Sequence, residues 1–185
     1  MRVIAGSLKG RKLDTPTWEG IRPTSDKLRE TLFNVVAQRV PAARVLDAYA
    51  WTGAIGIEAL SRGAAHVTFV DDDLRSLKLV ERNLARCGVS DRYVIIRARL
   101  GGATPATLLG PPMGSLASFD LAVLDPPYDE QDLTASIATV EPLVAPRGLL
   151  VLEHARKRSS PESAGALVRT RVLNSGDSAL SFYEL

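Results

Sequence analysis

The stretch RVLDAYAWTGAIGIEALSRGAAHVTFVDDD, residues 44–73, contains two short apolar runs separated by a glycine-containing loop and a helical segment. The run at 45–46 predicts a first strand, and 67–70 predicts a second. The segment between them predicts a helix that continues to about Arg62 and is closed by Gly63. Two strands joined by a helix lie parallel with a right-handed crossover, so this unit favours an α/β fold.

The same alternation continues to the end of the chain. Helices are expected between the strands, including one within 133–144, and residues 146–148 are expected to turn the chain. In the last two expected strands, apolar and polar residues alternate, which is typical of an antiparallel pair that closes the sheet edge. We therefore expect a mostly parallel, seven-stranded, Rossmann-like sheet with helices on both faces, whose later strands lie at 93–96, 119–124, 149–152, 166–173 and 179–183.

Residues 1–23 are rich in glycine, proline and basic side chains, and they predict a small hairpin-like arm. Residues 24–185 then form the main domain, starting with a helix capped by Thr24. Residues 1–40 hold eight Lys and Arg against four Asp and Glu, so 8 − 4 leaves +4 in a chain of net charge +2. Such a basic end suits an acidic partner such as nucleic acid, or simply solvates well.

Composition indicates one globular domain of ordinary size, because 45% of the 185 residues are apolar. The single Cys87 favours core packing over catalysis, and neither His66 nor His154 has metal-ligand spacing, so no metal is assigned. The chain start lacks a secretion signal, and no run is long enough to cross a bilayer. We expect a cytoplasmic, reduced setting with no membrane partner.

The sequence Asp125-Pro126-Pro127-Tyr128 follows the expected buried strand at 119–124. Two prolines cannot continue a ladder, so the strand ends here in a stiff turn. The Asp125 carboxylate and the Pro126 carbonyl can accept the two hydrogens of an exocyclic amine while Tyr128 stacks on its ring. The alternative is an ordinary strand end in which Tyr128 packs against the core.

The loop after the first strand is a candidate site for a nucleoside-like cofactor. Gly53 and Gly56 let backbone approach a ligand, and Asp71 at the end of the second strand can accept ribose hydroxyls. The dinucleotide fingerprint G-x-G-x-x-G is absent, which disfavours a nicotinamide cofactor. Asp47 adds negative charge that suits a cofactor carrying a sulfonium and an ammonium. The alternative is a solvated carboxylate at the end of the strand, and Asp72 and Asp73 are expected to be solvated or to cap the next helix.

Taken together, these motifs resemble the RsmD-type small-subunit ribosomal RNA methyltransferases, a family of class I S-adenosylmethionine-dependent enzymes with a Rossmann-like fold. The resemblance extends over nearly the whole chain. It is carried by the loop at 47–56, the acid at Asp71 and the turn at 125–128, together with blocks at 2–6, 10–13, 22–24, 29–30, 33–34, 58–64 and 176–180.

The resemblance implies direct transfer of a methyl group from S-adenosylmethionine to N2 of one guanine in 16S ribosomal RNA, of the guanine-966 type. It also implies a monomer that acts on the small ribosomal subunit, and an arm that helps to hold RNA. The implied catalytic residues are Asp125, Pro126, Pro127 and Tyr128. The implied cofactor residues are Asp47, Tyr49, Ala50, Gly53, Gly56, Asp71, Asp72 and Asp125. The candidates for phosphate contacts are Lys9, Arg11, Lys12, Arg22, Lys27 and Arg29.

Two residues depart from the family pattern, in which Trp51 is usually Gly and Arg99 is commonly Asp or Asn. The Trp51 indole can plug the pocket, point outward or stack on a ligand, and we expect weaker cofactor binding than with glycine. A catalytically silent RNA-binding or assembly factor is the runner-up. An adenine-N6 DNA methyltransferase and a protein glutamine methyltransferase are further alternatives.

Overall fold

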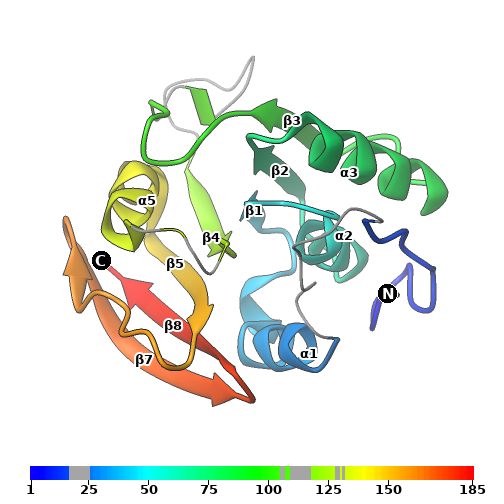
Figure 1. The fold of residues 1–185 in the computed structure, drawn as a ribbon. Helices are drawn as coiled ribbons and strands as arrows, with labels where there is room; N and C mark the ends of the chain where they lie inside the picture. Colours follow the sequence, from blue (N-terminus) through cyan, green and yellow to red (C-terminus); the bar gives the residue numbers. More distant parts are fainter. Residues whose placement is uncertain (17–25, 105–106, 109–117, 128–129, 131) are drawn as a thin grey trace.

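The computed structural model describes residues 1–16, 26–104, 107–108, 118–127, 130 and 132–185. The described residues form one eight-stranded sheet in the order β3-β2-β1-β4-β5-β8-β7-β6 (Figure 1). Its strands are β1 (Arg44–Ala48), β2 (His66–Asp71), β3 (Tyr93–Arg97), β4 (Phe119–Leu124), β5 (Val144–Ala155), β6 (Ser163–Ala164), β7 (Leu167–Ser175) and β8 (Ser178–Glu184). The helices are α1 (Asp26–Val35), α2 (Ala54–Ser61), α3 (Leu74–Arg86) and α5 (Leu133–Val140), with 3₁₀ turns at Ala37–Arg39 and Glu141–Leu143.

Strand β1 lies at the point where the strand order reverses. It pairs in parallel with β2 on one side and with β4 on the other, so that Ala48 is opposite Val70 and Leu124. The carboxyl ends of these three strands therefore meet at one edge of the sheet. In open α/β sheets, ligands bind at this switch point.

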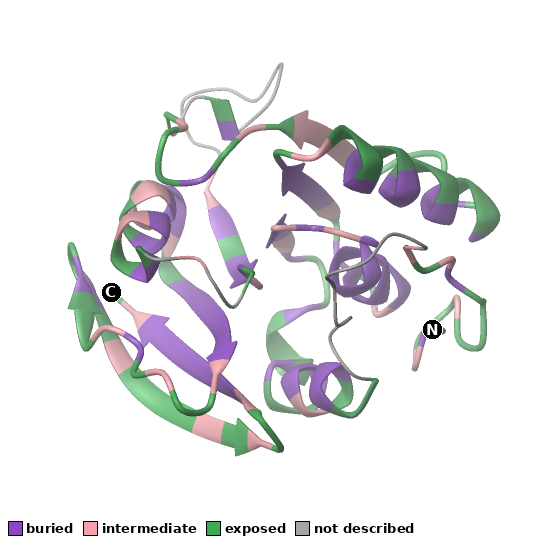
Figure 2. Cartoon of the chain, viewed as in Figure 1, coloured by how far each residue is buried: buried purple, intermediate pink, exposed green. Residues whose placement is uncertain are grey.

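Alternate side chains of the central strands face two separate apolar cores. Val45 of β1 belongs to the core that contains buried residues of α1, α2 and α3, whereas its neighbour Leu46 belongs to the core that contains those of α5. Figure 2 shows that the central strands are almost continuously buried between these layers. The expectation of a mostly parallel sheet with helices on both faces is confirmed. None of the described helices has the length and apolar character needed to cross a bilayer.

Two details of the predicted fold are wrong. The sheet has eight strands and not seven, because the two-residue β6 pairs with β7. The expected turn at 146–148 lies inside β5, where the register with β4 shifts between Phe119 and Leu121 and residues 145–148 take up the excess length. The helix expected within 133–144 is confirmed as α5, which ends at Val140 because Pro142, in the 3₁₀ turn that follows, has no N–H to continue it.

The N-terminal segment folds back on itself and lies against α2. The Val3 N–H donates to the Arg11 carbonyl at 2.9 Å, and Arg2 and Lys12 form one isolated antiparallel bridge. In the described part of the expected arm, residues 1–16, this single bridge is present and no regular strand forms. The expected boundary at residue 23 and the expected cap Thr24 lie outside the described residues.

Glu58 of α2 anchors this N-terminal segment from the protein interior. Its fully buried carboxylate accepts the N–H groups of Ile4 and Ala5 at 2.7 and 2.9 Å and the Arg62 side chain at 2.8 Å. The Arg29 Nε lies 4.0 Å from the same carboxylate. One acid therefore connects the segment, α1 and α2.

The expected phosphate contact by Arg29 is wrong. Its side chain is 0% exposed, and its Nη2 donates inward to the Arg2 carbonyl at 2.5 Å and to Asp26 at 2.9 Å. Burial lowers the pKa of Arg29, against the nearby charges of Asp26 and Glu58, which raise it. Arg29 thus acts inside the protein, where it connects α1 to the N-terminal segment.

Removing the Glu58 carboxylate is expected to destabilise the protein strongly. Glu58→Ala removes the acceptor of the Ile4, Ala5 and Arg62 N–H groups and takes one of two nearby carboxylates from the buried Arg29 guanidinium, which predicts a loss of about 3 kcal/mol in the free energy of unfolding. Urea unfolding measures this, with Glu81→Ala on the exposed side of α3 as the control expected to leave stability unchanged. Equal stability of the two variants would contradict the anchoring role.

Candidate active site at the ends of β1, β2 and β4

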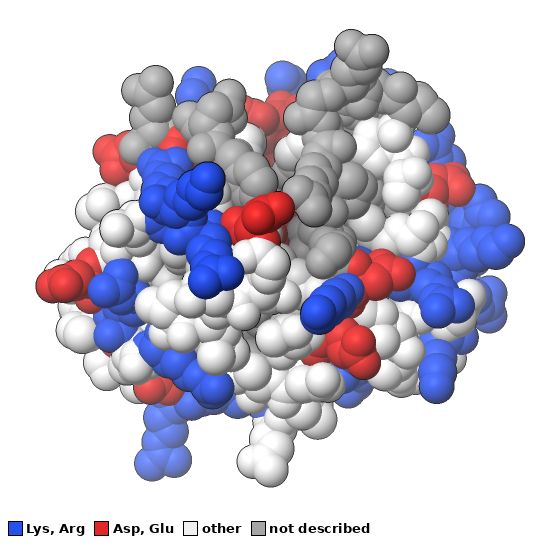
Figure 3. Space-filling view, turned by 60° about the horizontal axis from the view of Figure 1, so that its bottom comes forward, with Lys and Arg blue, Asp and Glu red and all other residues white. Residues whose placement is uncertain are grey.

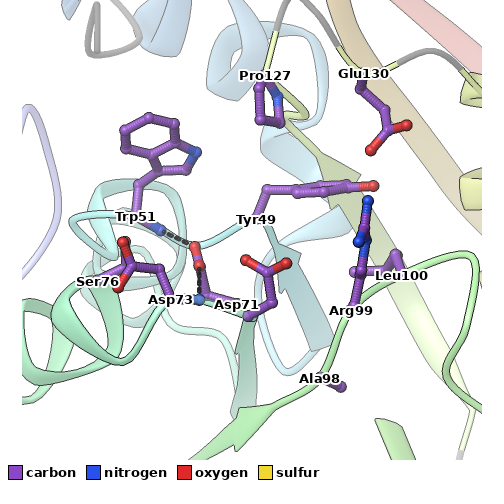
Figure 4. A pocket seen from close by; sticks show the side chains of 11 residues that line it. Tyr49, Trp51, Asp71, Asp73, Ser76, Ala98, Arg99, Leu100, Pro127 and Glu130 are labelled. Atoms are coloured by element: carbon purple, nitrogen blue, oxygen red, sulfur yellow. Dashed lines mark hydrogen bonds between the residues drawn. The ribbon is translucent and has the colours of Figure 1, made fainter. Parts of the chain in front are cut away.

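A cavity of about 520 Å³ opens beyond the carboxyl ends of the strands (Figure 4). Its walls come from the loop after β1, the end of β2, the segment after β3 and the turn after β4. The lining residues are Tyr49, Trp51, Asp71, Asp72, Asp73, Ser76, Ala98, Arg99, Leu100, Pro127 and Glu130. A volume of this size accommodates a nucleoside-sized ligand.

The loop after β1 is held in a tight conformation. Tyr49 and Trp51 both adopt left-handed backbone angles, with φ of 61° and 55°. Hydrogen bonds compensate for this strain, because the Ala50 N–H donates to the Val70 carbonyl at 2.9 Å and the Trp51 N–H donates to Asp71 Oδ2 at 3.0 Å. The loop is therefore held directly against the end of β2.

The Trp51 side chain borders the cavity and does not fill it. In Figure 4 its indole and the Arg99 guanidinium lie on opposite sides of the Tyr49 ring, and the cavity remains open with both in place. The indole therefore does not plug the pocket, which was one of its three expected placements.

Asp71 is placed where a ribose-binding acid is expected. It is 7% exposed, and its two oxygens accept the N–H groups of Trp51 and Asp73 at 3.0 and 2.9 Å. Each carboxylate oxygen retains a second lone pair, so two ribose hydroxyls can still donate to it. Burial raises the pKa of Asp71, although the two backbone N–H groups act in the opposite direction.

The neighbouring acids have different roles. Asp72 lines the cavity beside Asp71. Asp73 also borders the cavity, and its carboxylate accepts the Arg75 N–H at 2.8 Å as the cap of α3. The expected capping by Asp73 is confirmed.

Asp47 lies beneath the loop and does not line the cavity. It is 1% exposed, and its Oδ2 accepts the Gly56 N–H at 2.8 Å. Burial raises the pKa of Asp47 well above its usual range, and the charges of Asp125 and Asp71 raise it further. Asp71 and Asp125, which belong to the strands on either side of β1, thus lie close enough to act on the Asp47 carboxyl.

The glycines of the loop serve its packing. Gly53 adopts φ of 73° as the cap of α2, and a Cβ on it would lie 3.1 Å from Val80. A Cβ on Gly56 would lie 2.2 Å from the Phe69 ring, which is an impossible contact. Gly56 therefore allows α2 to approach β2 closely. The expected cofactor residues Ala50, Gly53 and Gly56 do not line the cavity.

Tyr49 connects the loop to the other face of the sheet. Its hydroxyl lies 2.7 Å from the Ser136 Oγ of α5, and burial raises its pKa. Sequence reasoning missed Ser136 and the cavity residue Glu130. Neither belongs to a recognisable motif, although Glu130 follows Asp125 by only five positions.

The turn after β4 lies at the same edge of the sheet. The Asp125 N–H donates to the Ala48 carbonyl of β1 at 3.2 Å, which places the turn beside the loop, and Pro127 lines the cavity. Asp125 itself is half-buried next to the cavity, and Pro126 is buried. Tyr128 lies outside the described residues.

The other described candidates for phosphate contacts do not line the cavity. Lys9, Arg11 and Lys12 are exposed on the N-terminal segment, and Lys27 is exposed on α1. Together with Arg2, Lys9 and Lys27 line a groove of about 400 Å³ between these two elements. On the face seen in Figure 3, basic side chains are interspersed with acidic ones and form no continuous patch. Arg22 lies outside the described residues.

The remaining cysteine and histidine side chains have structural environments. Cys87 is buried in the core, as expected, and the His154 Nε2 lies 2.9 Å from the Ser181 Oγ. In the part of the chain that the structure describes, no three His, Cys, Asp or Glu residues are arranged to hold a metal ion.

Comparison with known proteins places this geometry in a family. The model of a family described as "Conserved hypothetical protein 95" matches residues 1–184. The chain belongs to this family, the RsmD family. The match includes the N-terminal segment, the loop, the acid after β2 and the turn after β4.

Relatives of the RsmD family support the same assignment. The chain is 36% identical over 186 residues to "Putative rRNA methyltransferase YlbH" of Bacillus subtilis, covering 100% of this chain and 98% of that protein. It is 37% identical over 130 residues to "Ribosomal RNA small subunit methyltransferase D" of Haemophilus influenzae, covering 69% of this chain and 64% of that protein. Among solved structures, "Putative methyltransferase yhhF from Escherichia coli" superposes with a TM-score of 0.81 at 30% identity, covering 99% and 96% of the two chains.

Neutralising Asp47 is expected to stabilise the fold at high pH only. Because burial raises the folded-state pKa of Asp47 above its unfolded value, the wild-type chain loses stability as the pH rises from about 4 through the raised pKa. Asp47→Asn keeps an acceptor for the Gly56 N–H and carries no charge. Denaturant unfolding at several pH values should therefore show the variant as the more stable chain at pH 8, with a difference that shrinks toward pH 4. A difference independent of pH would contradict this assignment.

Proposed function

We propose that this protein is an S-adenosylmethionine-dependent methyltransferase that modifies N2 of a guanine in small-subunit ribosomal RNA, of the guanine-966 type. The observation that carries the proposal is the meeting of the acid-lined cavity and the turn at 125–127 at one edge of the sheet. The printed names of the relatives point to the same substrate class.

The described residues fit S-adenosylmethionine. Asp71 offers acceptors for the ribose hydroxyls, and Ala98 and Leu100 offer apolar surface for the adenine ring. The carboxylates of Asp71 and Asp72 in the cavity wall, with Asp125 beside the cavity, favour a ligand with a sulfonium and an ammonium. When bound, this cofactor supplies a methyl group activated by the positive sulfur.

The turn after β4 orients the target amine in this proposal. The Asp125 carboxylate and the Pro126 carbonyl accept the two N2 hydrogens, which directs the nitrogen lone pair at the methyl group. Tyr128 is proposed to stack on the guanine. As the new N–C bond forms, the S–C bond breaks, and the N2 proton leaves to Asp125 or to water. The reaction needs no covalent enzyme intermediate.

The arm at 1–23 is proposed to hold the RNA. Exposed Lys9, Arg11, Lys12 and Lys27 contact phosphates, and the target guanine leaves its stack to reach the recessed turn. A catalytically silent RNA-binding factor is the weaker candidate, because its premise was a pocket blocked by Trp51 and the cavity is open.

Transfer of labelled methyl groups tests the proposal directly. Small ribosomal subunits that lack the modification are incubated with the protein and labelled S-adenosylmethionine, and the product nucleotide is mapped by nuclease digestion and mass spectrometry. We expect one N2-methylguanine, and a rate about 100-fold lower for Asp125→Ala, which loses an acceptor for the amine. Label on a different base, or none with wild-type protein, would refute the proposed reaction.

Replacing Trp51 by glycine is expected to tighten cofactor binding. Glycine adopts the left-handed angle at this position without strain and removes the indole from the cavity edge, while the N–H that donates to Asp71 remains. Calorimetric titration with S-adenosylmethionine measures the effect, and Trp51→Phe serves as a control that keeps an aromatic wall. Weaker binding by the glycine variant would show instead that the indole stacks on the ligand.

A further inference from the structure

Asn83 of α3 is a buried amide whose contacts all lead to distant segments. Its side chain is 0% exposed. The Oδ1 accepts the Asp14 N–H at 2.8 Å, and the Nδ2 donates to the Asp14 carbonyl at 3.1 Å and to the Thr52 carbonyl at 2.9 Å. One side chain thus binds both peptide groups of Asp14 and the loop after β1.

Thr52 lies between two residues that attach that loop to β2 and α2. It follows Trp51, whose N–H donates to Asp71, and precedes Gly53, which caps α2. Asp71 therefore fixes the loop through the N–H of Trp51, and Asn83 fixes it through the carbonyl of Thr52. Thr52 is itself 3% exposed, and its Oγ1 lies 3.7 Å from the Met1 sulfur, a second contact with the N-terminal segment.

The side chain of Asp14 makes a separate set of contacts. Its carboxylate pairs with Arg86 at 2.5 Å and with Arg82 at 3.3 Å on the exposed surface of α3. These ion pairs join the same two elements, but they do not reach the loop. Two kinds of contact thus join the N-terminal segment to α3. The Asn83 amide also binds the loop, whereas the ion pairs of Asp14 do not.

We infer that Asn83 is a positioning residue that sets the cofactor loop through its bonds to the N-terminal segment. Without the amide, the Thr52 carbonyl loses its buried donor, so the loop keeps its bonds to Val70 and Asp71 of β2 but loses its bond to α3. Cofactor affinity then depends on the N-terminal segment even when no RNA is bound. The inference rests on the proposed cofactor site.

Calorimetric titration with S-adenosylhomocysteine tests this on wild type, Asn83→Ala and Asp14→Ala. We expect the dissociation constant to rise about tenfold for Asn83→Ala, the effect of one lost hydrogen bond, and to stay unchanged for Asp14→Ala, which keeps both peptide contacts. Asn83→Asp keeps the acceptor for the Asp14 N–H but lacks both donors, so it should weaken binding similarly. Urea unfolding establishes that each variant is folded, and Ser181→Ala, a buried serine next to His154, controls for general loss of stability.

The fluorescence of Trp51 provides a readout of the loop itself. In a Trp18→Phe background, Trp51 is the remaining tryptophan, and its emission should shift in Asn83→Ala but not in Asp14→Ala or Ser181→Ala. Wild-type affinity and an unshifted emission in Asn83→Ala would overturn the inference alone. Absence of binding by the wild-type chain would overturn the proposed cofactor site and the inference with it.

Discussion

The parallel pairing of β1 with β4 is the constraint on which the rest of the structure depends. This pairing places Ala48 opposite Leu124, so that the loop after β1 and the turn after β4 leave the sheet side by side. The next peptide groups continue the contact, because the Asp125 N–H donates to the Ala48 carbonyl. Neither segment forms a site alone. Together with Asp71 from the adjacent β2 they border one cavity, in whose wall the carboxylates of Asp71, Asp72, Asp73 and Glu130 lie with the guanidinium of Arg99.

Most of the fold follows from local patterns in the sequence. Apolar runs alternating with helical segments predicted the parallel strands and the antiparallel closing pair, because buried strands and amphipathic helices have different periods. The errors arose where long-range pairing decides the structure. β6 is only two residues long and exists because Leu167 and Val168 offer it a partner. The extension of β5 depends on a bulge opposite β4, which no local pattern encodes.

The sequence indicated which acids meet at this edge of the sheet, but not that Asp47 is buried beneath the loop and does not line the cavity. The positions of Asp47, Asp71 and Asp125 follow from the rule that parallel strands end at one edge. The burial of Arg29 was not predictable, because a basic side chain off the apolar stripe is normally solvated, and here Glu58 and Asp26 enclose it. The hydrogen-bond partners of Asn83 were equally unpredictable, because Thr52 and Asp14 lie 31 and 69 positions away in the sequence.

A crystal structure with bound S-adenosylhomocysteine tests the central claim most directly. The account predicts the ribose hydroxyls on the Asp71 carboxylate, the indole of Trp51 at the edge of the ligand, and the sulfur facing the turn at 125–127. A ligand seated elsewhere, or one whose sulfur lies far from that turn, would contradict the claim that the β1–β4 pairing builds a methyl-transfer site.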